Sequence, residues 1–431
     1  MYGIGTYMRE MTAYLCCQKD ISLNIVQLHA ERKDFTIEQE NGYKVYNFPY
    51  NRHPSNNRNQ QRYYKNIWYI LRQYIKPDKQ DRLVFHLNFH QEHSLISILK
   101  KDFPECLTIY TIHYQEWFFL LNGNYSKFKK IINSEKDIPI GSIEKDVFYS
   151  YKKEKLLYTN VDAIICLGNY ARDILTEDYK ISDNKIKVIN NGISDEAILL
   201  SPAKRKKMRQ QLFIPENEII ILYAGRLDEI KGVDVLIKAF GLIVNKYSNC
   251  HLYIVGDGED MNNYIEKGRG FWRKITYTGK LKKEDLYKFY QVADIGVIPS
   301  LYESFGYVAI EMMMHNIPMV VSGTSGLNEI VTDGINGYKI PINETDETVK
   351  ISAEDIKNSV LDVIKSIHVK NNALRNVFLE KYTIQKTMGK YIALIYESVW
   401  VESYVKSIKL MPMRDNWTTM DWKSIGSEKG L

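Results

Sequence analysis

Short apolar segments alternate with longer amphipathic segments along most of the 431-residue chain. Segment 219–225, Ile-Ile-Ile-Leu-Tyr-Ala-Gly, is apolar on both faces, as a strand must be when helices cover both sides of a parallel sheet. Successive apolar segments stand roughly 20 to 30 residues apart, which leaves room for one crossover helix between neighbouring strands. The pattern predicts an α/β fold with helices such as 59–74 and 91–101. The predicted strands are 23–28, 44–48, 83–87, 107–112, 163–167, 186–189, 219–225, 251–255, 275–278, 295–299, 319–322 and 337–340.

The series of predicted strands starts twice, which indicates two Rossmann-like domains in tandem. The boundary is predicted near residues 195–215, where Pro202, a basic run and Pro215 interrupt the pattern. Helix-like spacing returns after residue 382 and runs through 391–409, and the tail from residue 411 looks frayed. We therefore place the domains at 1–197 and 198–390, a final helix at 391–410 and a tail at 411–431.

The beginning of the chain breaks the expected order of a doubly wound domain. Gly3-Ile4-Gly5-Thr6 reads as a glycine turn that opens a helix. Such a turn normally follows the first strand of the domain, and no strand-like segment precedes this one. The first strand of the N-terminal domain is therefore predicted to be missing, either from this chain, through a misassigned start, or from the domain itself.

Composition narrows the class of protein. The chain is 45% hydrophobic and 26% charged, which is typical of a folded protein. It has no membrane-length apolar run and no signal peptide, so we expect a cytoplasmic protein. The five cysteines form no CxxC, and no histidines cluster at zinc spacing, so neither a metal site nor a disulfide framework is expected.

The formal net charge of +6 is modest, and no nucleic-acid-binding motif accompanies it, so nucleic acid is not an expected partner. The basic run 204–207, Lys-Arg-Lys-Lys, leaves two readings open. It is either a solvated face or a patch for peripheral contact with an anionic membrane, where each basic residue contributes about 1 kcal/mol.

The main candidate chemistry follows the predicted strand 295–299. Glu303 lies in the loop after this strand, and Glu311 lies about one turn into the apolar helix that starts after Gly306. Ligands of open α/β sheets bind at the carboxyl ends of the strands, where amides at a helix start bind anions. A carboxylate such as Glu311 needs a partner in apolar surroundings, which is either a structural group or a ligand diol.

Two cations follow the first strand of the second domain, at the same sheet edge. Arg226 and Lys231 lie in Gly-Arg-Leu-Asp-Glu-Ile-Lys-Gly. A departing nucleotide diphosphate gains negative charge, so fixed cations aimed at it stabilise the transition state selectively. Gly256 ends the next strand, and Lys280 with Leu281 follows the one after, where backbone groups can meet a base.

The assembled motifs resemble those of the GT-B fold retaining glycosyltransferases of the large family 4 group (GT4). The family's E-x7-E motif matches Glu303 to Glu311, and its basic pair matches Arg226 and Lys231. Asn190-Asn191-Gly192-Ile193 resembles its Pro-Asn-Gly-Val segment, with Asn190 in place of proline. The match is strong over 190–341 and weaker over the first half of the chain.

The resemblance implies a role for each matched residue. Arg226 and Lys231 would hold the diphosphate, Glu303 the donor sugar and Glu311 the ribose hydroxyls. His113 would be the active-site histidine near the reacting sugar, although Tyr114 follows it where the family usually has aspartate. The remaining implied donor-binding residues are Gly3 and Gly5 of the glycine loop, Gly256, Lys280, Leu281, Ser304, Phe305, Gly306 and Tyr307.

The resemblance also implies the reaction. It is a hexosyltransferase-type transfer without a metal and with retention, from a UDP- or GDP-sugar to a glycan, lipid-linked or peptide acceptor, as in bacterial surface polysaccharide or glycoconjugate synthesis. The two domains would face a cleft, with an acceptor-binding N-terminal domain, a donor-binding second domain and helix 391–410 crossing back to the first.

Two other functions remain open from the sequence. The nucleotide-sugar 2-epimerases share the two-domain architecture, and they are not expected to combine the Arg226 and Lys231 pair with the Glu303 and Glu311 pair. A non-catalytic nucleotide-sugar-binding partner is the other alternative, because the first strand is predicted missing and Tyr114 is unusual.

Overall fold

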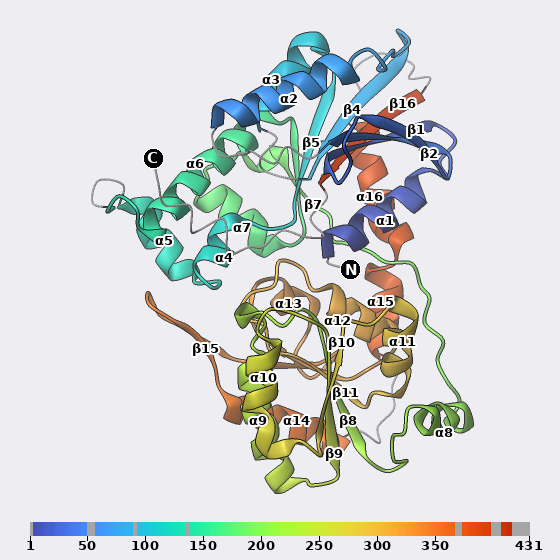
Figure 1. Ribbon diagram of the computed structural model, residues 1–431, viewed down its shortest axis with the longest axis vertical. Helices are drawn as coiled ribbons and strands as arrows, with labels where there is room; N and C mark the ends of the chain where they lie inside the picture. The colour runs from blue at the N-terminus through green and yellow to red at the C-terminus, as the bar shows by residue number, and fades with distance from the viewer. Residues whose placement is uncertain are drawn as a thin grey trace. The chain divides into compact units, whose positions relative to one another are not determined.

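The computed structural model describes residues 3–49, 57–88, 93–134, 138–366, 373–397 and 407–415. The chain divides into two compact units (Figure 1). Unit 1 consists of Met1–Trp117, Ile131–Gly192 and Ile384–Leu431, and unit 2 consists of Phe118–Lys130 and Ile193–Thr383. Both units are built on a parallel sheet with helices, so the predicted pair of Rossmann-like α/β domains is confirmed.

Unit 1 contains an eight-stranded sheet in the order β2-β3-β1-β16-β4-β5-β6-β7. Its neighbouring strands run parallel, except that β2 and β3 form an antiparallel hairpin across the turn Asn41-Gly42. All six residues of β5 are buried, as a strand covered on both faces requires. The strands are β1 (Ile21–Ala30), β2 (Thr36–Glu40), β3 (Tyr43–Pro49), β4 (Asp81–Leu87), β5 (Leu107–Ile112), β6 (Ala163–Cys166), β7 (Ile186–Val188) and β16 (Ser407–Asp415).

Amphipathic segments between these strands form helices in the described part of unit 1. The helices are α1 (Gly3–Leu15), α2 (Asn57–Leu71), α3 (His93–Asp102), α6 (Ile143–Asn160), α7 (Asn169–Glu177) and α16 (Ile384–Glu397). Two further helices, α4 (Glu116–Leu120) and α5 (Tyr125–Asn133), extend across the boundaries of the segment that unit 2 takes from this part of the chain.

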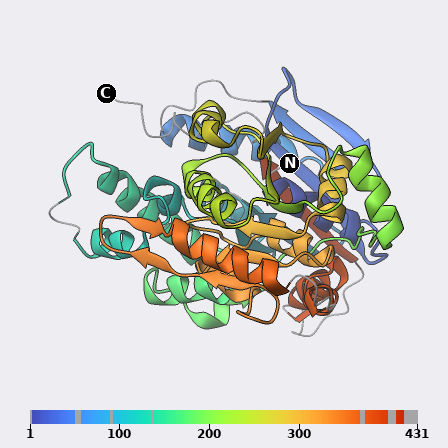
Figure 2. The ribbon, with the colours of Figure 1, turned by 90° about the horizontal axis from the view of Figure 1, so that it is seen from below.

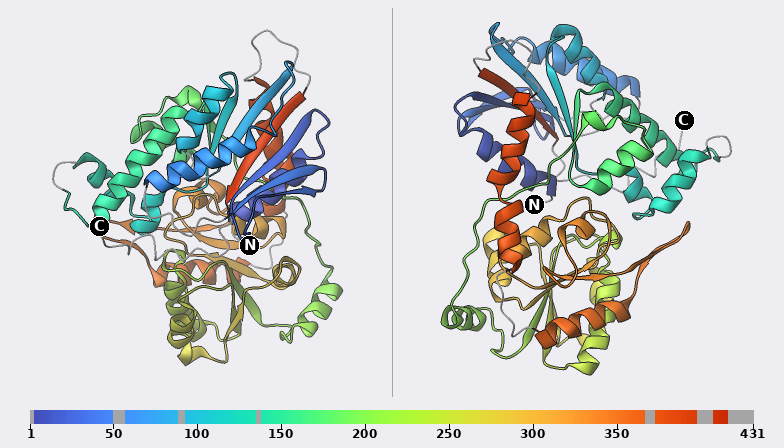
Figure 3. Two further views of the ribbon diagram at one scale, coloured as in Figure 1. Left: turned by 45° about the horizontal axis from the view of Figure 1, so that its top comes forward. Right: turned by 180° about the vertical axis from the view of Figure 1, so that it is seen from behind.

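Strand β16 corrects two expectations from the sequence. A helix over 391–410 and a frayed tail from 411 were expected, whereas α16 ends at Glu397 and a strand follows at Ser407–Asp415. Figure 3 shows this strand, in red, between the blue strands β1 and β4, where it pairs in parallel with both. The central place in the sheet is therefore filled by a strand from the C-terminal part of the chain. Pro412, which lacks an N–H for the ladder, makes the segment read as non-strand.

Unit 2 contains a six-stranded sheet in the order β10-β9-β8-β11-β12-β13, and its neighbouring strands are parallel. Its core buries Ile221, Phe240 and Val297 completely. The elements are β8 (Ile219–Ala224), β9 (Cys250–Val255), β10 (Ile275–Gly279), β11 (Ile295–Ile298), β12 (Met319–Ser322), β13 (Tyr338–Ile340), a hairpin of β14 (Ile342–Glu344) and β15 (Val349–Ile351), α8 (Pro202–Gln211), α9 (Val233–Lys246), α10 (Met261–Lys267), α11 (Lys283–Val292), α12 (Tyr307–Met314), α13 (Ser325–Ile330), α14 (Ala353–Ser366) and α15 (Ala373–Lys381).

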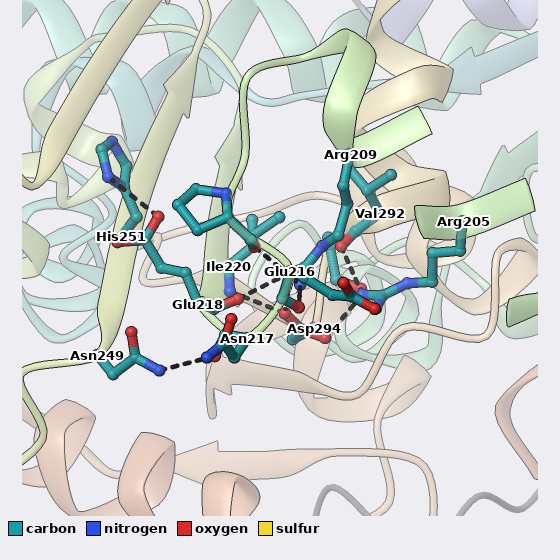
Figure 4. Close-up of polar contacts among 12 residues, drawn as sticks. Arg205, Arg209, Glu216, Asn217, Glu218, Ile220, Asn249, His251, Val292 and Asp294 are labelled. Atoms are coloured by element: carbon teal, nitrogen blue, oxygen red, sulfur yellow. Dashed lines mark hydrogen bonds and ion pairs between the residues drawn. The ribbon is translucent and has the colours of Figure 1, made fainter. Parts of the chain in front are cut away.

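A buried guanidinium ties α8 to the amino-terminal side of this sheet (Figure 4). Arg209 is 3% exposed and donates to Asp294 Oδ2 (2.8 Å) and to the carbonyl oxygen of Glu218 (2.8 Å). Asp294 Oδ2 also accepts the amide of Ile220 (2.8 Å), so one carboxylate connects α8 with the start of β8. Arg205 reaches Asp294 Oδ1 (2.7 Å), which gives this member of the basic run a structural partner.

Among the described residues, no helix has the length and apolarity needed to cross a bilayer.

Truncating the buried side chain at the middle of β16 should destabilise unit 1. Leu410 is fully buried, so Leu410→Ala should lower the free energy of unfolding by about 2 to 5 kcal/mol, as large-to-small core substitutions do. Urea denaturation followed by tryptophan fluorescence measures this change. Leu199→Ala, at a half-exposed position, is the matched control and should change it by less than about 0.5 kcal/mol. Equal stability of the two variants would rule out a central place for β16.

Candidate functional site

The loops after the strands of unit 2 are joined to one another at the carboxyl edge of the sheet. The amide of Gly225 donates to the carbonyl oxygen of Val255, and the amide of Leu227 donates to that of Asp257, both at 3.0 Å. The amide of Gly256 likewise donates to the carbonyl oxygen of Gly279 at 3.0 Å. Hydrogen bonds of the main chain therefore hold the three loops after β8, β9 and β10 in one row.

Lys231 is brought to this edge by a close backbone contact. It ends a short 3-10 turn, Glu229–Lys231, and Gly232 follows in the left-handed region with φ 66°. A β-carbon at Gly232 would lie 2.1 Å from the carbonyl oxygen of Pro299, so only glycine fits there. The amide of Leu301 donates to the carbonyl oxygen of Ile230 at 2.8 Å and fixes the turn against the loop after β11.

The packed turn places Lys231 against Glu303. The distance from Lys231 Nζ to Glu303 Oε2 is 2.5 Å, and the two side chains are 18% and 22% exposed. Ser325 holds the main chain of Glu303, since its hydroxyl donates to the carbonyl oxygen (2.7 Å) and accepts from the amide (3.0 Å). Glu303 is therefore held both at its carboxylate and at its main chain.

Arg226 lies in the neighbouring loop and is half-buried. Its Nη2 is 2.8 Å from Asp228 Oδ2, and the Tyr223 hydroxyl donates to its carbonyl oxygen (2.6 Å). Burial, followed by the charge of Asp228, raises the pKa of Tyr223 well above its usual range, which keeps this hydroxyl protonated and able to donate. Asp228 is a partner that sequence reasoning did not single out, although it lies within the quoted motif.

The start of α12 provides the predicted backbone amides. Gly306 precedes the helix with φ 108°, and no side chain caps it. Phe305 is 3% exposed, whereas Ser304 and Tyr307 are half-buried. The segment is packed closely from behind, because a β-carbon on Gly326 would lie 2.7 Å from the carbonyl oxygen of Ser304.

Glu311 has a structural partner in the protein. The hydroxyl of Tyr290, on α11, donates to Glu311 Oε2 at 2.9 Å. Burial, followed by the charge of Glu311, raises the pKa of Tyr290 well above its usual range, so the hydroxyl stays a donor. Sequence reasoning missed Tyr290, because nothing in the pattern of α11 distinguishes it from other buried aromatic residues.

The other predicted donor residues lie at the ends of β9 and β10. Gly256 directly follows β9 and is half-buried. Lys280 is exposed and Leu281 half-buried, and both follow the left-handed Gly279 at the end of β10. The structure therefore brings the predicted unit 2 residues to one sheet edge, and it places Lys231 and Glu303 in direct contact.

In unit 1, His113 directly follows β5. Its side chain is buried, and its Nε2 lies 3.0 Å from Asn88 Oδ1, at the end of β4. The ring of Tyr7, from α1, packs edge-on against it with centroids 4.6 Å apart. Gly3 and Gly5 are exposed in the first turn of α1, so the predicted glycine turn is the helix start itself.

A second histidine, His86, lies near His113 and was not predicted from the sequence as a candidate. His86 is fully buried between the Thr111 hydroxyl (2.7 Å from Nε2) and the Tyr391 hydroxyl (2.9 Å from Nδ1). Burial lowers the pKa of His86 to about 3, so the ring is neutral at physiological pH. It links β4 and β5 to α16, and a lone histidine in an apolar strand gives no sequence signal for such a role.

A buried carboxyl group lies under the segment that follows His113. Glu154 of α6 is 1% exposed, its Oε1 accepts the amide of Glu116 (2.9 Å), and its other oxygen accepts the hydroxyl of Tyr179. Burial, followed by the negative charge of Glu116, raises the pKa of Glu154 to about 8. The group is therefore mostly protonated at neutral pH.

Two family models match this chain. Residues 1–197 match Glycosyltransferase Family 4, and residues 204–373 match Glycosyl transferases group 1. An uncharacterized glycosyltransferase of Methanocaldococcus jannaschii is 32% identical over 51% of this chain and 56% of its own length. A lipopolysaccharide 1,2-N-acetylglucosaminetransferase of Salmonella typhimurium is 26% identical over 48% and 55%. The chain thus spans about half the length of these relatives.

Solved structures agree with this assignment at the level of the fold. Sucrose-phosphate synthase from Thermosynechococcus elongatus superposes with a TM-score of 0.68 at 18% identity, over 92% of this chain and 94% of the other. The Anabaena protein HepE, solved in complex with UDP and glucose, gives 0.59 at 17% identity, over 83% and 87%. With its two family matches and two Rossmann-like units, the chain belongs to the GT-B glycosyltransferases of the GT4 type.

Replacing Glu154 by glutamine should remove one contribution to the pH dependence of stability. The folded-state pKa of about 8 lies above that of an unfolded glutamate, so this group's contribution is fully present at low pH and is lost as pH rises towards 8. Between pH 5.5 and 7.5 the unfolding free energy of Glu154→Gln should rise by about 2 to 3 kcal/mol relative to that of the wild type. Urea denaturation at both pH values measures the difference. The exposed Glu347→Gln should behave as wild type, and a Glu154→Gln curve parallel to wild type would contradict the assignment.

Proposed function

We propose that this chain is a retaining glycosyltransferase that moves a hexosyl group from a nucleotide diphosphate sugar to an acceptor hydroxyl. The observation that carries the proposal is the contact of Lys231 with Glu303 beside the start of α12. A cation, a carboxylate and helix-start amides at the carboxyl edge of a parallel sheet suit a diphosphate joined to a sugar.

Each group has a distinct role in donor binding. Arg226, Lys231 and the amides of 305–307 bind the diphosphate, and Glu303 accepts hydrogen bonds from the sugar hydroxyls. Glu311 binds the ribose hydroxyls and is oriented by Tyr290. The loops at Gly256 and at Lys280 with Leu281 provide backbone groups for the base.

The reaction proceeds on one face of the sugar. The bond between the anomeric carbon and the β-phosphate oxygen breaks, and the acceptor oxygen bonds to the same face of that carbon. The acceptor proton passes to the departing phosphate oxygen. Lys231 and Arg226 stabilise the charge that develops on the leaving group, in place of a divalent metal. In unit 1 we assign His113 to the reacting sugar, and Gly3 and Gly5 to the phosphates and acceptor.

The donor and acceptor are proposed at the level of class. The UDP in the HepE structure supports a UDP-sugar as donor, with a GDP-sugar as the alternative to be tested. The Salmonella transferase supports a glycan or lipid-linked acceptor in surface polysaccharide synthesis, ahead of a peptide.

A cytoplasmic location with peripheral membrane contact remains a prediction. Arg205 and Lys206 of the basic run are paired with Asp294 and Glu216, which leaves Lys204 and Lys207 as the side chains to test.

Removal of Lys231 should reduce turnover far more than it reduces folding stability. Thermal shifts with UDP-, GDP- and ADP-sugars identify the donor, because a specific ligand stabilises the fold in proportion to RT ln(1 + [L]/Kd). With that donor, Lys231→Ala should lower kcat by about 100- to 1000-fold, the loss expected for one transition-state donor. Release of the nucleotide diphosphate, with and without cell-derived glycan acceptors, measures it. Lys238→Ala, a lysine 66% exposed in α9, is the control and should keep wild-type activity.

Two outcomes would contradict the proposal. Accumulation of free epimerised nucleotide-sugar without acceptor would indicate the epimerase alternative. Donor binding that persists without any turnover, together with unchanged cellular glycan in a folded Glu303→Ala variant, would indicate a non-catalytic binding partner.

A further inference from the structure

Residues 118–130, which we call the brace, belong to unit 2, although the segments before and after them along the chain belong to unit 1. The brace begins shortly after His113 and contains most of α4 and α5. Its residues Phe118 and Phe128 are buried, at 5% and 0% exposed. The brace is therefore part of the packed body of unit 2.

The brace contacts unit 2 at the residue directly before Glu303. The ring of Phe118 stacks on the ring of Tyr302 with centroids 4.4 Å apart and planes 15° apart, and Tyr302 is 4% exposed. Gly123, with φ 80°, comes so close that a β-carbon there would lie 2.7 Å from the β-carbon of Tyr302. Tyr302 is thus held from two points of the brace.

Separate contacts anchor the brace itself. Buried Asn124 donates through Nδ2 to the carbonyl oxygen of Thr345 (2.9 Å) and accepts the amide of Lys127 at Oδ1 (2.8 Å). The amide of Ser126 donates to Glu344 Oε1 at 2.6 Å. Thr345 and Glu344 belong to the β14–β15 hairpin, which lies alongside the brace in Figure 2. The brace is therefore fixed to a part of unit 2 that does not include the Glu303 loop.

We propose that the brace is a positioning element for Glu303, with Phe118 as its main positioning residue acting through Tyr302. Lys231 approaches the Glu303 carboxylate from the side of β8, and Ser325 holds the Glu303 main chain from the side of α13. The stack on Phe118 restrains the loop from a third direction, at the residue that precedes the carboxylate.

The consequence for turnover rests on the function proposed above. The nucleotide diphosphate is held by Arg226, Lys231 and the amides of 305–307, whereas Glu303 acts on the sugar. A loosened brace should therefore leave nucleotide binding nearly intact and slow transfer. A displacement of about 1 Å at a reacting group can cost about 100-fold in rate.

The test compares Phe118→Ala with Phe118→Trp, which restores an aromatic stack, and with Phe240→Leu, which disturbs a buried aromatic in the core of unit 2. For Phe118→Ala we expect turnover of the nucleotide sugar to fall by about 10- to 100-fold. The Kd for the free nucleotide diphosphate, measured by calorimetry, should change by less than about threefold. Phe118→Trp should recover most of the turnover.

A second measurement does not depend on enzymatic activity. The contact with Glu303 shields the Lys231 amine, so acylation of Lys231, followed by mass spectrometry of its peptide, should be several-fold faster in Phe118→Ala. Exposed Lys238 should react at the wild-type rate in every variant. This acylation result supports the positioning role even if the wild type turns over no nucleotide sugar, in which case only the proposed function fails.

Two results would overturn the inference. In the first, Lys231 acylation in Phe118→Ala equals that of wild type, whatever the activity. In the second, nucleotide affinity, turnover and thermal stability fall together in Phe118→Ala as they do in Phe240→Leu, which would show only general destabilisation.

Discussion

The sheet edge of unit 2 that carries the candidate site depends on one close backbone approach, in which the chain at Gly232 passes the carbonyl oxygen of Pro299. Any side chain at this position would push apart the loops that follow β8 and β11. Because they meet, the lysine that closes one loop lies 2.5 Å from the carboxylate of the other. A partly buried pair of this kind is costly to desolvate and gains most when its geometry is fixed. Here Ser325 and the brace hold Glu303, and the turn at Gly232 holds Lys231.

The fold could largely be predicted from the sequence because most strands are buried on both faces. All twelve predicted strands are present, since runs such as 219–225 have a single physical explanation in a parallel sheet. The missed strands lack that signature. Strand β2 is a polar edge strand whose residues alternate in exposure, β14 and β15 are three-residue pieces, and β16 carries a proline in a central position.

The candidate site could be predicted only where chemistry leaves a local pattern. Glu303, Glu311, Arg226 and Lys231 stand at the ends of predicted strands or at helix starts, so topology alone brings them to one edge. Tyr290, His86 and Phe118 act through contacts with residues distant in the chain, and their local sequences resemble any buried aromatic or apolar segment. Partners of this kind are fixed by packing in three dimensions, which periodicity along the chain does not record.

The central position of β16 has a consequence for the order in which the two units form during synthesis. Strands β1 and β4 leave the ribosome early. Strand β16, which pairs with both of them, is translated only after the whole of unit 2. Unit 2 can fold from residues 193–383 and the brace while the first sheet is still divided into two parts. The open strand edges expose unpaired N–H and C=O groups throughout that interval, and nascent chains in this state are natural clients of chaperones. Unit 2 can therefore be complete before unit 1, although most of unit 1 precedes it in the chain.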